Sequence, residues 1–246
     1  MLSNRIELTA IADSEILAGF DVRAPFMTAG TADYVQDGLI AQWDGIENVG
    51  QGLQHDSAAA VWKDLVGTRD LPLVAGRGSF TSNALYCAGG SYAAGPTNEL
   101  TGFQTIEVVC GRTTSGNGIL FDGGLNSVCF TVNAGDTFFM GNGRFYRFFR
   151  SPTTLAWRSG ARYTADGVAA RHTLTTDSWS NNDRQLAVGA RITGPAVYPY
   201  KGEVHAIRVY DRALTDAELA HNFLLDSIRF FGRERPKRTG SVLIVR

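Results

Sequence analysis

Carboxylates are the first residues to test for chemistry, because a retaining glycosidase places two of them about 5 Å apart on one face of its active site. The sequence contains two acid-x-acid pairs, Asp13-Ser14-Glu15 and Asp216-Ala217-Glu218. The first precedes the predicted domain, and the second lies at the predicted start of a helix. Neither pair falls on a predicted core strand, so the sequence predicts no glycosidase activity.

The histidines give no sign of a metal or nucleophile site. His55, His172, His205 and His221 have no metal-ligand spacing to one another, and the sequence has neither a phosphate-binding glycine loop nor a G-x-S-x-G elbow. His205 falls within an apolar strand pattern, where a hydrogen-bonded core histidine is the simplest interpretation. These absences predict a protein that is not an enzyme.

Aromatic and arginine side chains are the better candidates for binding a ligand. Two loops, residues 178–183 and 192–201, precede the last strand pattern, and we expect a ligand to meet these loops and the concave face of a sheet. The candidate ligand-binding residues are Trp179, Arg191, Tyr198 and Tyr200. Tyrosine rings stack on sugars, and an arginine fork binds a carboxylate or sulfate of an acidic glycan. The alternative is that Tyr198 and Tyr200 cap an edge of the fold.

The stretch from residue 200 to 223 must position these loops. Val204, Ala206, Ile207, Val209 and Tyr210 form an apolar run on both parities, which predicts a central strand covered on both faces. A helix should begin near Asp216. Thr215 and Glu218 have capping-box spacing, while Leu214 and Leu219 have the spacing of a hydrophobic staple.

This stretch resembles the closing strand of the laminin-G-like, concanavalin A-like lectin/glucanase superfamily. The matching residues are Gly202, Val204, Ile207, Arg208, Val209, Tyr210, Arg212, Ala213, Leu214, Thr215 and Glu218. Similar stretches extend the likeness over about three quarters of the chain, from Tyr34 to about Leu225. The sequence departs from the family at His205 and Ala206, and again at Cys87 and Ala88, where members carry acids or an aromatic residue.

The resemblance implies an all-β fold, an antiparallel two-sheet jelly-roll sandwich with one short C-terminal helix. The predicted organisation is an N-terminal extension at residues 1–33, the sandwich at 34–230, and a basic tail at 231–246 that holds a strand-like segment. Trp43 and Trp62 are interpreted as core or rim anchors rather than sugar platforms, given the area that a tryptophan buries.

The resemblance also raises calcium as a cofactor, because the ion is common in this superfamily. Calcium takes several oxygen ligands, often from loop carboxylates and carbonyls. The candidate ligands near a family strand are Asp44, Glu47, Asn48 and Asp56. Solvated turn acids are the alternative, and the spacing favours it because it fits no known calcium loop.

Composition excludes several partners. The net charge is −1, so no global field favours nucleic acid, and no apolar run approaches the length needed for membrane insertion. The sequence shows no secretory signal. We expect an extracellular, cell-surface or virion location, reached without a signal peptide in this chain.

Two binding functions and one catalytic function remain. The resemblance favours a non-catalytic glycan-recognition or adhesion module of laminin-G-like type, with a carbohydrate or surface glycoconjugate as partner. The alternative is a structural or receptor-facing component of a phage tail or surface appendage, which meets a protein partner through the N-terminal extension or the C-terminal tail. A glycoside hydrolase is third, because the carboxylate set is missing.

Overall fold

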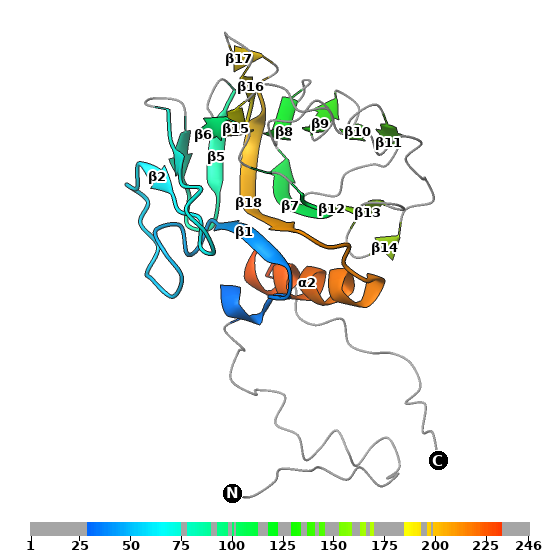
Figure 1. The fold of residues 1–246 in the computed structure, drawn as a ribbon. Helices are drawn as coiled ribbons and strands as arrows, with labels where there is room; N and C mark the ends of the chain where they lie inside the picture. The colour runs from blue at the N-terminus through cyan, green and yellow to red at the C-terminus, as the bar shows by residue number, and fades with distance from the viewer. Residues whose placement is uncertain are drawn as a thin grey trace, which may run out of the picture.

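The structure is a computed structural model of the chain, in which two antiparallel sheets pack face to face and one α-helix lies against the outside (Figure 1). It describes residues 29–74, 78–89, 93–97, 100, 102–112, 118–122, 129–133, 137–140, 143–145, 153–158, 163–165, 168–169, 185–192, 196–197 and 199–232. The predicted antiparallel sandwich with a C-terminal helix is confirmed. Its jelly-roll topology stays a prediction, as do the domain bounds.

Among the described residues, the larger sheet has eight strands, in the order β14-β13-β12-β7-β18-β5-β4 with β1 also paired to β18. These strands are β1 (Leu39–Asp44), β4 (Gly78–Phe80), β5 (Leu85–Ala88), β7 (Thr105–Arg112), β12 (Thr153–Arg158), β13 (Tyr163–Ala165), β14 (Val168–Ala169) and β18 (Lys201–Tyr210). The strand that closes the chain therefore lies in the middle of the sheet.

In the part of the chain that the structure describes, the smaller sheet has six strands, in the order β11-β10-β9-β8-β15-β6. These strands are β6 (Ala93–Thr97), β8 (Gly118–Asp122), β9 (Cys129–Asn133), β10 (Thr137–Met140), β11 (Gly143–Phe145) and β15 (Gln185–Val188). Two short ribbons complete the described strands, β2 (Val61–Trp62) with β3 (Leu71–Pro72), and β16 (Arg191–Ile192) with β17 (Ala196–Val197).

β18 organises the larger sheet. It pairs with β7 along nearly its whole length, with β5 along its first half and with β1 along its second half. The register against β7 shifts between Val204 and Ala206, which places a bulge at His205. Every residue from Val204 to Tyr210 is buried. The prediction of a central strand covered on both faces is confirmed.

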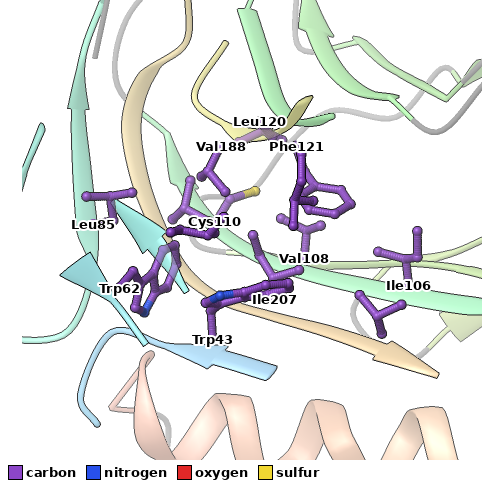
Figure 2. Packing of buried hydrophobic residues seen from close by; sticks show 14 of the residues in the cluster. Trp43, Trp62, Leu85, Ile106, Val108, Cys110, Leu120, Phe121, Val188 and Ile207 are labelled. Carbon is purple, nitrogen blue, oxygen red and sulfur yellow. The ribbon is translucent and has the colours of Figure 1, made fainter. Parts of the chain in front are cut away.

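The space between the two sheets holds the main hydrophobic core (Figure 2). Trp43 and Trp62 are fully buried there, and their indole N–H groups donate to the backbone carbonyls of Arg69 and Asp44. A buried tryptophan needs such an acceptor, because an unpaired N–H away from water costs free energy. Their prediction as core anchors is confirmed.

The helix α2 (Asp216–Arg229) covers the outer face of the larger sheet along the second half of β18. It begins as predicted: Thr215 accepts from the Glu218 amide, and the Glu218 carboxylate accepts from the Thr215 amide. Leu214 and Leu219 lie together against Tyr210. A 3-10 turn, η1 (Thr31–Asp33), precedes β1, and Ala29 and Tyr34 beside it pack on Leu225. None of the helices that the structure describes is long and apolar enough to span a membrane.

Candidate functional site

The outer face of the larger sheet carries a cluster of deeply buried charged groups. Arg208 projects from β18 toward α2, and its side chain is fully buried. Its two terminal nitrogens donate to the two oxygens of Asp226 at 2.9 and 2.8 Å, and its Nε donates to Glu107 at 2.8 Å. The Tyr34 ring lies over the guanidinium, 4.1 Å from centroid to carbon. The Arg208 cluster (Tyr34, Glu107, Arg208, Asp226) ties three elements together.

Neutral side chains add hydrogen bonds to this cluster, although Glu107 Oε1 is buried without a partner. Tyr34 and Thr154 each donate to Asp226 at 2.8 Å, and Asn222 donates to Glu107 at 2.7 Å. Burial by itself lowers the pKa of Arg208, but Asp226 and Glu107 raise it well above its usual value. Burial raises the pKa of Glu107, against the effect of Arg208. These groups are closed off from solvent and serve the packing of helix on sheet.

The predicted calcium ligands Asp44 and Glu47 meet a second arginine instead of open space. Arg229, from the last turn of α2, donates to Asp44 at 2.8 Å and lies 3.4 Å from Glu47. Asp44 Oδ1 also accepts from the amides of Ile46 and Glu47, while Asp44 Oδ2 is buried without a partner. Burial raises the pKa of Asp44, opposed by Arg229. The Arg229 guanidinium supplies positive charge beside these two carboxylates.

The Glu47 oxygens are taken by other donors. Oε2 accepts from the Thr31 hydroxyl and from the Gly52 amide, each at 2.7 Å. Burial opposes ionisation of Glu47, but these hydrogen bonds and Arg229 lower its pKa. The carboxylate therefore fastens the loop after β1 to the start of the described chain.

The other two predicted calcium ligands bind each other. The Asn48 side-chain amide donates to the Asp56 carbonyl at 2.7 Å and its oxygen accepts from the Asp56 amide at 3.0 Å. The Asp56 carboxylate accepts from the Ala58 amide. Within the described ranges, no three His, Cys, Asp or Glu side chains are arranged to hold a metal. The contacts do not fit a calcium shell as they stand, and calcium binding stays a prediction.

The predicted glycan-binding residues fall mainly outside the described residues. Trp179 and Tyr198 lie there entirely, and for Arg191 only the backbone, in β16, is described. Tyr200 is 5% exposed and belongs to the core between the sheets, and its hydroxyl donates to the Gly111 carbonyl. The structure thus buries Tyr200 in the core, and the alternative of an edge cap stays a prediction. Its contact with a ligand stays a prediction.

Sequence reasoning missed the residues that surround His205 on the part of the outer face next to the end of α2. Leu85 and Cys87 of β5 point into the core, so Tyr86 between them faces outward. Glu203 of β18 lies between two cross-strand partners, Tyr86 of β5 on one side and Gly111 of β7 on the other. His205 lies two residues after Glu203 on β18 and is 4% exposed. The Phe230 and Phe231 rings lie against it. We call Tyr86, Gly111, Glu203 and His205 the outer-face group.

The prediction of His205 as a hydrogen-bonded core histidine is confirmed, since its Nδ1 lies 3.2 Å from the Asn83 carbonyl oxygen. The outward direction of Tyr86 and Glu203 follows from strand alternation, and that signal was present in the sequence. The sequence held no signal for the strand order that brings β5, β18 and β7 together. A bulge at His205 also breaks the simple alternation.

Comparison with solved structures shows the fold. Trypanosoma rangeli sialidase in complex with sialic acid matches at a TM-score of 0.56 and 13% identity, over 78% of this chain and 34% of that one. The same sialidase with 2,3-difluoro-KDN matches at 0.57 and 13%, over 78% and 33%. The carbohydrate-binding module CBM40 of the Ruminococcus gnavus IT-sialidase matches at only 0.44 and 16%, over 57% of this chain and 96% of that one.

The likeness to the sialidase structures shows a β-sandwich fold, and at 13% identity it shows the fold alone. The chain spans about a third of the length of the sialidase structures it matches. No protein-family model matches the sequence, and no curated protein matches it. The laminin-G-like resemblance and the phage-tail alternative both stay predictions.

Proposed function

We propose that this chain is a non-catalytic glycan-recognition or adhesion module. Two facts support a carbohydrate partner. The sandwich is similar to part of a sialidase that was solved in complex with sialic acid, and the described surface offers a tyrosine beside hydrogen-bonding side chains. Fold likeness by itself does not carry a function, so the proposal rests on the chemistry of the face as well.

The proposal that the module is non-catalytic rests on how little the carboxylates of the described strands are exposed to solvent. Four carboxylates lie on the described strands, and Asp44, Glu107 and Asp122 are at most 1% exposed. Glu203 is the remaining one, with its side chain 37% exposed. Hydrolysis of a glycosidic bond by two carboxylates needs both to reach the sugar. One accessible carboxylate among the described strands can bind hydroxyls but does not by itself supply both roles.

The test uses the full chain on an array of neutral and acidic glycans, together with an assay for released reducing ends. We expect retention on a subset of the glycans and no release of sugar. Turnover that disappears when a sandwich acid is replaced by its amide would contradict the non-catalytic part. Absence of retention on every glycan, with and without added calcium, would contradict the glycan-binding part.

A further inference from the structure

The protonation of His205 can be assigned from its neighbours. Nδ1 lies 3.2 Å from the Asn83 carbonyl oxygen, which can only accept, so Nδ1 carries the ring proton. Burial lowers the pKa of His205, and the imidazole is therefore neutral at pH 7. Its other nitrogen, Nε2, is then left with a lone pair and acts as an acceptor.

The Glu203 carboxylate is a second hydrogen-bond acceptor close to His205 Nε2. Glu203 Oε2 lies 3.9 Å from His205 Nε2, which exceeds hydrogen-bond distance. The two would form an ion pair only if the ring gained a second proton, which burial disfavours. Two acceptors therefore lie close together with no proton between them. A group that donates a hydrogen bond to each of them would relieve this arrangement.

Gly111 leaves room for such a group. A Cβ atom built at residue 111 would lie 3.2 Å from His205 Nε2 and 3.3 Å from Glu203 Oε2. Any larger residue would thus crowd both acceptors on the face of β7. Because residue 111 is a glycine, no side chain at this position of β7 lies between the two acceptors and a ligand.

An aromatic ring lies beside the acceptors. Tyr86 is the direct cross-strand partner of Glu203 and is half-buried, and the exposed Ser79 is the direct partner of Tyr86 on β4. Sugar rings pair an apolar face with equatorial hydroxyls, so they match an aromatic face flanked by acceptors. Cross-strand pairing therefore places Ser79, Tyr86, Glu203 and Gly111 side by side on the neighbouring strands β4, β5, β18 and β7.

We propose that the outer-face group binds a neutral sugar, whose adjacent hydroxyls donate to His205 Nε2 and Glu203 Oε2 while its ring packs on Tyr86. The proposal rests on the proposed function in taking a glycan as the ligand. It differs from the sequence prediction in both place and charge, because a carboxylate at the site repels acidic sugars. A metal ion fits less well, since two side chains are too few ligands and the described residues form no larger metal cluster.

The experiment measures retention of the full chain on neutral oligosaccharides and on matched oligosaccharides that end in sialic or uronic acid. The variants are Tyr86→Ala, Glu203→Gln and Gly111→Ala, with Tyr86→Phe to keep the ring. Asp70→Asn is the matched control, because the Asp70 side chain is 36% exposed against 37% for Glu203 and lies in the β2–β3 connection. Melting temperatures identify any variant that is merely unfolded.

We expect the intact chain to bind neutral glycans, and Tyr86→Ala, Glu203→Gln and Gly111→Ala each to weaken this binding at least tenfold with little change in melting temperature. Tyr86→Phe and Asp70→Asn should keep it. Neutral-glycan binding that survives all three site variants overturns the inference and leaves the proposed function standing, as does binding to acidic glycans alone. Retention abolished by a chelator assigns the group to a metal and overturns it. No binding to any glycan overturns both proposals.

Discussion

At the scale of single residues, Arg208 shows how an ion can be tolerated inside this sandwich. An arginine fork matches both oxygens of a carboxylate, and Arg208 meets Asp226 in this way while its Nε reaches Glu107. The desolvation of such a cluster offsets much of its attraction, so it contributes little net stability. Removal of one member is different, because the remaining charges stay buried without compensation.

Arg208→Ala should therefore lower the free energy of unfolding by about 3–5 kcal/mol, since it leaves Glu107 and Asp226 buried together. Lys63→Ala is the control: its ion pair with Asp70 is exposed, and its loss should cost less than about 1 kcal/mol. Urea unfolding measures both. Arg208→Lys, which keeps the charge but loses the fork, serves if the alanine variant does not fold. Equal costs for Arg208 and Lys63 would contradict the prediction.

At the scale of elements, the start of α2 combines a capping box with an ion pair. Glu218 accepts from the Thr215 amide and also binds Arg212, with side-chain atoms 2.6 Å apart. The side-chain hydrogen bond from Arg212 is the main cause that lowers the pKa of Glu218 from 4.5 to about 2. The helix that covers β18 is thus tied to the turn that leads into it.

A carboxylate whose pKa is lower in the folded state stabilises the fold above its unfolded pKa and loses that effect as pH falls. Glu218→Gln should lower the free energy of unfolding by up to about 1 kcal/mol at pH 7, since the side chain is partly exposed. The difference from the unchanged chain should shrink as pH falls from 4.5 toward about 2. Urea unfolding at a series of pH values measures it. A difference that stays constant with pH would show that the ion pair contributes nothing.

At the scale of the whole molecule, both sheets close over one core. Cys87 of β5 and Cys110 of β7 are thiols within that core, and they lie opposite Gly202 and Val204 of the strand between them. Burial raises the pKa of Cys87 to about 12. The thiolate is the reactive form of cysteine, so neither chemistry nor access favours modification in the folded chain.

In a Cys129→Ser variant, Cys87 and Cys110 should resist an aromatic disulfide reagent in native buffer and both react in guanidinium chloride. Absorbance of the released thiol measures the reaction, and near-ultraviolet circular dichroism reports the fold. Fast modification with an unchanged spectrum would mean that the core opens without unfolding.

The sequence by itself determined the local features of this protein. The capping box at Thr215 and Glu218, the helix start near Asp216 and the buried strand from Val204 to Tyr210 all follow from spacings within a few residues. Each depends on contacts between chain neighbours, which periodicity and capping rules describe well. The sandwich followed from the resemblance that these features carry.

Only the tertiary structure decided which side chains meet. Arg208 is 101 residues from Glu107, and Arg229 is 185 residues from Asp44. No local pattern could therefore show the buried ion pair of Arg208, or that Arg229 lies against the predicted calcium ligand Asp44. Tyr86, Gly111 and Glu203 come together because β5 and β7 pair with opposite edges of β18 in one register. Strand order and register are set by burial over the whole sheet, and a shift of one residue would turn every one of these side chains to the other face.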